Sequence, residues 1–171
     1  MRRRRALHAA TVAAFALGAL PRATRAQDVS RARPHGEVRA DYIGPRPHTV
    51  QLGAGLNLPV GPYLRVGVIG GGGVGWRDGR SGASGRADVI GRFALDPFRE
   101  HRWGLSAGGG LSVRYDAIEA SSSSHRWRAL VAVVVDLEGP QAGSVAPALQ
   151  LGLGGGVRAG VVLRGAQSGF R

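Results

Sequence analysis

Apolar and polar positions alternate along most of the chain, and residues 103–116, WGLSAGGGLSVRYD, show the pattern most clearly. One phase of this segment consists of Trp103, Leu105, Ala107, Gly109, Leu111, Val113 and Tyr115. The other phase holds glycine, serine, one arginine and one aspartate. Successive side chains of a strand point to opposite faces, so a period of two predicts an extended segment between two different environments. The segment is also long enough to cross a bilayer, which takes about 9–11 tilted residues.

The same alternation predicts seven further strands. The expected strands span residues 37–42, 49–58, 63–76, 86–96, 103–116, 126–138, 145–153 and 157–164. Gly154–Gly156 are expected to form a three-residue loop that keeps Leu153 and Val157 on one face. Residues 77–85 and 117–125 are rich in glycine or serine and are predicted to be long polar loops. The chain is therefore predicted to be all-β, an eight-stranded antiparallel up-and-down transmembrane barrel.

Alternation alone leaves open which phase faces the barrel interior. An inward apolar phase would make a soluble periplasmic or secreted barrel that binds a small hydrophobic ligand, and an outward one a membrane barrel. The polar phase is mostly Gly, Ser and Asn, which suits the narrow interior of eight strands. The aromatic residues are expected to form two girdles at the ends of the barrel, as they do at membrane interfaces. One girdle would contain Tyr42, Trp76, Tyr115 and Trp127, and the other Tyr63, Phe98 and Trp103. These features favour an outward apolar phase.

The first 26 residues have the pattern of a cleavable signal peptide. Four arginines precede an apolar run over residues 6–20, and Thr24-Arg25-Ala26 suits cleavage before Gln27. Residues 27–36 are predicted to be a flexible lead, and residues 37–171 the barrel domain. Six of the 23 basic residues and none of the 11 acidic ones lie before the cut, so the formal net charge falls from +12 to +6. These arginines are interleaved with acids along strands, a pattern that does not favour nucleic-acid binding.

Charged residues on the polar phase are expected inside the barrel. They are Arg86, Asp88, Arg92, Arg114, Asp136, Glu138 and Arg158. Side chains nearly fill an eight-stranded barrel, so mutual pairing is favoured over a conducting pore. The chain has no cysteine, which excludes disulfides and thiolate metal sites.

The segments WGLSAGGGLSVRYD and RWRALVAVVVDLEG, together with the two girdles and the leader, resemble the small outer-membrane β-barrels of the outer membrane protein A and X type. The resemblance implies an eight-stranded barrel in the cell outer membrane with a structural or surface-interaction role. Its expected partners are the lipid bilayer and, through residues 77–85 and 117–125, lipopolysaccharide or other envelope components.

Two patterns suggest other chemistry. Gly70, Gly72 and Gly75 spell the dinucleotide-binding motif, but no helical pattern follows to hold a pyrophosphate. Residues 119–125 combine Glu119, four serines and His125, which leaves a lipid A-modifying barrel enzyme as a second alternative. A run of serines is more typical of a flexible loop, so no catalytic, cofactor or metal residues are predicted.

Overall fold

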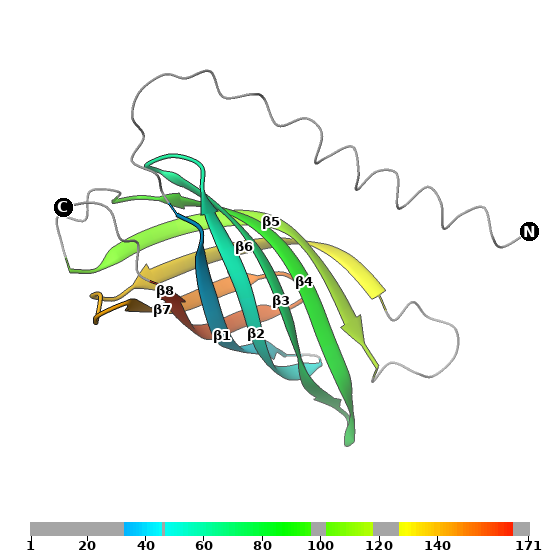
Figure 1. Ribbon diagram of the computed structural model, residues 1–171. Helices are drawn as coiled ribbons and strands as arrows, with labels where there is room; N and C mark the ends of the chain where they lie inside the picture. Colours follow the sequence, from blue (N-terminus) through cyan, green and yellow to red (C-terminus); the bar gives the residue numbers. More distant parts are fainter. Residues whose placement is uncertain (1–32, 46, 97–101, 118–126, 166–171) are drawn as a thin grey trace, which may run out of the picture.

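Eight antiparallel strands close into a barrel, and each strand pairs with its sequence neighbours (Figure 1). The structure is a computed structural model that describes residues 33–45, 47–96, 102–117 and 127–165. The strands are β1 (His35–Gly44), β2 (His48–Pro59), β3 (Leu64–Arg77), β4 (Arg80–Ala94), β5 (Gly104–Asp116), β6 (Trp127–Glu138), β7 (Val145–Leu153) and β8 (Val157–Gly165). β1 pairs with both β2 and β8, so the sheet has closed on itself. The predicted fold class is confirmed.

The strands are staggered by ten residues around the barrel. The row of paired residues that leaves β6 at Glu138 passes through Ala148, Val162, Arg39, Gly53, Gly71, Arg86 and Arg114 and returns to β6 at Arg128. The two β6 residues differ by ten positions (138 − 128). A stagger of this size tilts the strands by about 40° from the barrel axis.

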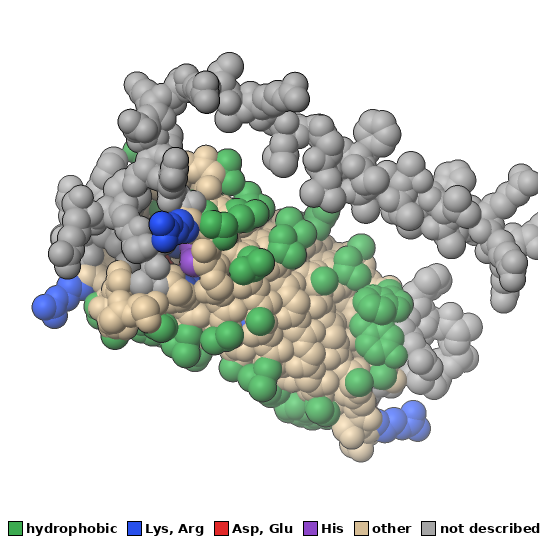
Figure 2. Space-filling model, in the orientation of Figure 1, with side chains coloured by type: hydrophobic (Ala, Val, Ile, Leu, Met, Phe, Trp, Pro, Cys, Tyr) green, Lys and Arg blue, Asp and Glu red, His purple; other side chains and the backbone are tan. Residues whose placement is uncertain are grey.

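The apolar phase of the strands faces outward. Leu52, Leu111 and Val131 are 69%, 67% and 71% exposed, whereas Asp136, Arg158 and Arg164 are 0–2% exposed. On the face seen in Figure 2, hydrophobic side chains and backbone cover the wall, and arginines gather near the two ends. The alternative of a soluble barrel with an apolar interior is therefore wrong for the described part of the chain.

A few apolar residues depart from the outward phase because they fill the interior beside glycines. Ile69 and Val134 break the alternation of their segments, and both are 1% exposed. They pack with Ile90 in a small cluster inside the barrel. The interior is thus mainly polar, and it includes a small apolar cluster.

The prediction of a long loop over residues 77–85 is wrong. β3 and β4 continue to the pair Arg77↔Arg80, and a two-residue turn of Asp78 and Gly79 joins them. Both turn residues have positive φ, 50° and 77°, which is the type I′ geometry that Asp-Gly favours in tight hairpins. Figure 1 shows this hairpin projecting at one end of the barrel. We call this end the distal end, and the end where β1 begins and β8 finishes the proximal end.

The other connections agree with the predictions from the sequence or lie outside the described residues. Leu153 pairs with Val157 across Gly154–Gly156, so the predicted three-residue loop is confirmed. β1 begins at His35, two residues inside the predicted flexible lead. Residues 1–32, which hold the predicted signal peptide, and residues 118–126 lie outside the described part. Among the described residues no helix is long and apolar enough to cross a membrane.

Candidate functional site

The barrel interior holds a balanced set of buried charges. Among the described residues, six arginines and six carboxylates on the inner face are buried. All seven predicted lumen residues, Arg86, Asp88, Arg92, Arg114, Asp136, Glu138 and Arg158, belong to this set. Sequence reasoning missed five members, which are Glu37, Arg39, Asp41, Asp116 and Arg164. Their alternation with outward apolar residues on β1, β5 and β8 was the signal that could have identified them.

The proximal layer of the interior joins five strands around two carboxylates. Asp136 on β6 lies 2.9 Å from the Nε atom of Arg92 on β4 and 2.8 Å from the Nη2 atom of Arg164 on β8. Glu37 on β1 accepts a 3.2 Å hydrogen bond from Arg164 and a 2.9 Å bond from Asn57 on β2. The Asp136 contacts each pass over one intervening strand, and the Glu37 bonds join β1 to its two neighbours β8 and β2.

The middle layer centres on Asp41 and Asp88. Arg39 donates to Asp41 at 2.7 Å, and Arg86 on β4 also donates to Asp41 across the interior. Arg158 on β8 donates to Asp88 on β4 at 3.0 Å. Each layer therefore links opposite walls of the barrel.

The distal layer is built around Arg114 of β5. Its Nε atom lies 2.7 Å from Asp116, and its Nη2 atom donates to Thr49 on β2 at 2.7 Å. Its Nη1 atom donates to the carbonyl oxygen of Gly155 at 3.1 Å. Arg114 thus spans the interior from β5 to β2 and to the β7–β8 turn.

Glycines on β2 and β3 provide the space for the arginines. A Cβ atom at Gly53 would lie 3.2 Å from the Cγ atom of Arg39, and one at Gly71 would lie 3.7 Å from the Nε atom of Arg86. Both glycines occupy the row of paired residues between Arg39 and Arg86. The glycines therefore leave space on this wall beside Arg39 and Arg86, and the two long side chains lie close to it.

This arrangement can seal the interior and hold the walls together. Ion pairs join different strands in the proximal and middle layers, and Arg114 crosses the distal layer through hydrogen bonds to Thr49 and Gly155. A continuous water path would therefore have to pass three sets of bonded side chains. Among the described residues no cluster of His, Cys, Asp or Glu could hold a metal ion.

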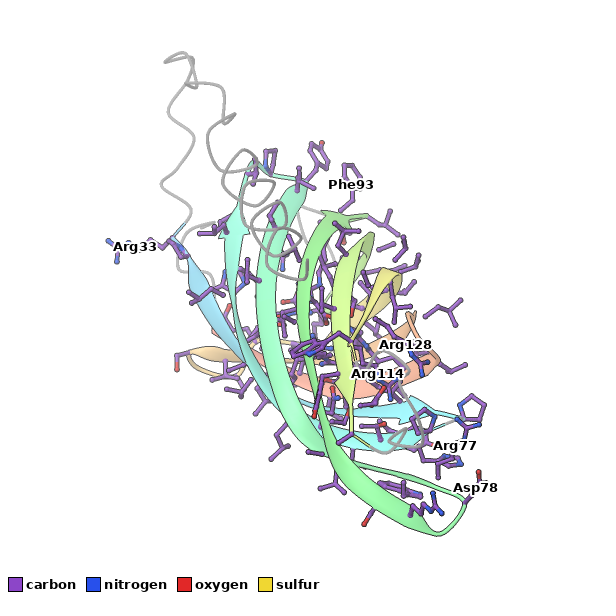
Figure 3. The ribbon with its side chains drawn as sticks, turned by 90° about the vertical axis from the view of Figure 1, so that its right-hand side faces the viewer. Arg33, Arg77, Asp78, Phe93, Arg114 and Arg128 are labelled. Carbon is purple, nitrogen blue, oxygen red and sulfur yellow. The ribbon has the colours of Figure 1, made fainter. Side chains whose placement is uncertain are left out.

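Aromatic side chains gather at both ends of the outer surface. At the distal end the ring of His48 lies 6.0 Å from that of Tyr42 and 6.1 Å from that of Trp76, and the Tyr115 and Trp127 rings are 5.0 Å apart. At the proximal end Tyr63 stacks on Phe93 at 5.5 Å, and Trp103 is 54% exposed. Figure 3 shows Phe93 at the end opposite Arg77 and Asp78.

The two aromatic groups are separated by a distance that suits a bilayer. Trp103 and Tyr115 lie twelve positions apart along one strand direction. At about 3.3 Å per residue and a tilt of about 40°, they are about 30 Å apart along the barrel axis. Of the predicted girdle residues, Phe98 lies outside the described part of the chain. His48 and Phe93 belong to the two aromatic groups but were not predicted there.

The residues considered for catalysis cannot be placed. Glu119, Ser121–Ser124 and His125 lie outside the described residues. The lipid A-modifying enzyme therefore stays an untested alternative.

Comparison with solved structures finds a likeness in fold. No family model and no curated protein matches the chain. The N-terminal β-barrel domain of OprF from Pseudomonas aeruginosa, a solved structure, superposes with a TM-score of 0.61 at 9% sequence identity. The match covers 77% of this chain and 95% of the OprF domain. The chain has the fold of that barrel domain. The OprF likeness confirms the resemblance to small outer-membrane barrels at the level of fold, and at 9% identity it extends no further.

Proposed function

We propose that this chain is a β-barrel protein of the cell outer membrane with a structural or surface-interaction role and without catalysis. The observation that carries the proposal is the distribution of side chains around the barrel, with apolar residues outside and charged residues inside, which is the reverse of a water-soluble protein. Large apolar residues are exposed on every strand, and the buried inner face holds six arginines and six carboxylates. A protein in water would leave this apolar surface unfavourably hydrated, whereas a bilayer would cover it.

Two further observations support the proposal. The aromatic groups at the two ends are about 30 Å apart, a separation close to the thickness of a bilayer's hydrocarbon core, which is also about 30 Å. The fold is that of the N-terminal β-barrel domain of OprF.

The first test compares the electrophoretic migration of the detergent-extracted membrane fraction with and without boiling. A closed barrel unfolds slowly and often keeps its compact form in unheated detergent. We expect the protein in the membrane fraction, with faster migration before boiling. A protein that is recovered in the soluble fraction and migrates identically in both samples would refute the membrane assignment.

Two leucine-to-arginine substitutions test whether lipid or water surrounds the outer surface of the barrel. Leu111→Arg places a charge on the outer surface between the aromatic groups, and Leu95→Arg places one beside the proximal group; the parent side chains are 67% and 57% exposed. In lipid vesicles, Leu111→Arg should lower the free energy of unfolding by about 2–4 kcal/mol and Leu95→Arg by about 0–1 kcal/mol. Urea unfolding measured by the gel shift tests this difference. Equal, small losses would indicate that water covers both positions.

The surface-interaction role is proposed for residues 117–125, with lipopolysaccharide or other envelope components as partners. Residues 77–85 no longer qualify as a loop, because most of them belong to β4. The absence of catalysis is tested by a lipid A deacylation assay of the parent and His125→Ala. We expect neither to be active, and activity that is lost in the variant would favour the enzyme alternative.

A further inference from the structure

The barrel wall is incomplete at its distal end, between β6 and the β7–β8 hairpin. β6 pairs with β5 from Trp127 onward, but it pairs with β7 only from Val133 onward. β7 finishes at Leu153, and Gly154–Gly156 turn the chain into β8. Figure 1 shows β6, in yellow, extending past the β7–β8 hairpin. Residues 127–132 therefore have no strand partner on this side among the described residues, and we call them the free edge.

The backbone groups of alternate residues point out from the free edge. The carbonyl oxygen of Val133 faces β7, because a Cβ atom at Gly152 would lie 2.5 Å from it. The carbonyl oxygen of Ala132 faces β5, because a Cβ atom at Gly109 would lie 3.0 Å from it. Successive residues of a paired strand direct their N–H and C=O groups to opposite sides. Three residues of the free edge therefore direct these groups away from β5, and they are Trp127, Ala129 and Val131.

The free edge lacks features that usually protect an exposed strand edge. Natural sheets guard such edges with lysine, proline or a β-bulge. The sequence of the free edge, WRALVA, contains neither lysine nor proline, and its register with β5 runs without a bulge. Its outward side chains are apolar, and those of Trp127 and Val131 are 63% and 71% exposed. The free edge is therefore a template on which a further strand can pair.

The free edge begins at the distal aromatic level and continues toward the middle of the bilayer. Val131 follows Trp127 by four positions in β6. At about 3.3 Å per residue and a tilt of about 40°, it lies about 10 Å closer to the middle. Hydrocarbon offers no hydrogen bonds to backbone groups at this depth. A partner that supplies N–H and C=O groups would therefore be bound favourably.

The spacing of the free backbone groups matches an extended peptide. Trp127, Ala129 and Val131 span five residues, close to the usual strand length of about 5–6 residues. A strand repeats its N–H and C=O groups at the same interval. A second copy fits less well, because antiparallel pairing of two free edges requires a two-fold axis perpendicular to the sheet. That axis would lie in the membrane plane, so one copy would be inverted.

The β7–β8 turn closes the proximal limit of the free edge. A Cβ atom at Gly155 would lie 2.6 Å from the Cδ1 atom of Leu130, and one at Gly154 would lie 3.2 Å from the Cα atom of Ala132. A partner strand therefore enters from the distal side and stops at the turn. β6 runs from the distal to the proximal end, so an antiparallel partner has its amino terminus at the turn.

We propose that the free edge binds the amino-terminal strand of another polypeptide by antiparallel β-strand addition. This inference rests on the proposed function, because the depth of the free edge follows from the bilayer. Main-chain hydrogen bonds to Trp127, Ala129 and Val131 supply the affinity. Directly opposite residues of two paired strands share a face, so the partner residues bonded to these three also point outward. Their side chains are apolar, because they continue the lipid-facing surface.

The test measures the binding of a pentapeptide, Val-Thr-Val-Thr-Val, to the detergent-purified full chain by fluorescence anisotropy. The peptide has a free amino terminus and a dye at its carboxyl end. With the valines outward, their N–H groups face β6 and those of the threonines face away. One control peptide is N-methylated at the second and third valines, and the other at both threonines. The two control peptides differ only in which side of the strand is blocked.

We expect methylation of the valine amides to weaken binding more than about tenfold, because it removes two hydrogen bonds to β6. Methylation of the threonine amides should change binding by less than about twofold. Val131→Pro removes an N–H that β5 does not use, and proline is tolerated at such edge positions. It should weaken binding about fivefold or more, and Val131→Ala, which keeps the N–H, should weaken it less.

Three results would overturn the inference. Equal binding of the two methylated peptides would indicate attachment by side chains alone. Unchanged binding to Val131→Pro would place the peptide elsewhere. A full chain that is dimeric alone and becomes monomeric when the peptide binds would assign the free edge to a second copy. Each sample is first tested for the boiling-dependent shift. A parent without the shift contradicts the membrane assignment itself, whereas a shifted parent that does not bind the peptide contradicts only this site.

Discussion

Replacing Asp136 with asparagine removes one negative charge from a carboxylate that holds three side chains. Asp136 is 0% exposed, accepts hydrogen bonds from Arg164 and Gln150, and lies 2.9 Å from Arg92. Breaking a buried ion pair by removing one partner costs about 3–5 kcal/mol, because the remaining charge stays buried without compensation. Arg92 and Arg164 both keep Glu37 as a partner, at 3.6 and 3.2 Å. We therefore expect Asp136→Asn to lower the free energy of unfolding by about 3 kcal/mol, at the low end of that range.

The control is the same chemical change at the distal turn. The Asp78 side chain is 86% exposed and lies 3.5 Å from Arg77, and asparagine tolerates its φ of 50°. An exposed pair of this kind contributes about 0–1 kcal/mol. Urea unfolding in vesicles, followed by tryptophan fluorescence and by the gel shift, compares the two variants with the parent. If Asp136→Asn were no less stable than Asp78→Asn, the interior ion pairs would not hold the barrel together, and the reasoning about the interior would be refuted.

Three further outcomes follow from the backbone and the outer surface. Gly79→Ala should cost about 1 kcal/mol in urea unfolding, because an L side chain is strained at a φ of 77°. Gly110→Ala should lower the free energy of unfolding by about 1–3 kcal/mol, because its Cβ atom would overlap the backbone oxygen of Val89. Gly70→Ala has open space and should change it by less than about 0.5 kcal/mol. The reversed order would contradict the packing. The fluorescence of the three tryptophans should be quenched more by lipids brominated near the headgroup than by lipids brominated near the chain end, and the opposite order would place the aromatic groups in the middle of the bilayer.

Strand number and phase could be predicted from the sequence because the inner and outer environments differ so strongly. Segments such as residues 103–116 alternate without interruption, and their apolar phase is exposed as the membrane interpretation required. The start of β4 was missed because Arg80–Gly85, RSGASG, has too few apolar side chains to display an alternation. The Asp78-Gly79 dipeptide was the available signal, since it favours a two-residue hairpin turn.

The partners of the interior charges could not be predicted, because they depend on the register of all eight strands. Glu37 and Arg164 are 127 positions apart in the sequence and form an ion pair only when β8 closes against β1. The layered arrangement likewise depends on the stagger of ten residues, because the residues that pair between neighbouring strands lie at different heights along the barrel axis. Periodicity identifies which side chains point inward, but it contains no information about which of them meet.

The closure of β1 against β8 means that the ladder has no topological beginning. Glu37, near the start of β1, pairs directly with Arg164, near the finish of β8, in the same antiparallel geometry as every other neighbouring pair of strands. The pairing of the strands therefore does not depend on which neighbouring strands are joined by a covalent turn. A circular permutant that joins the proximal ends of β8 and β1 by a short linker and opens at the Asp78-Gly79 turn would retain all eight strand pairings.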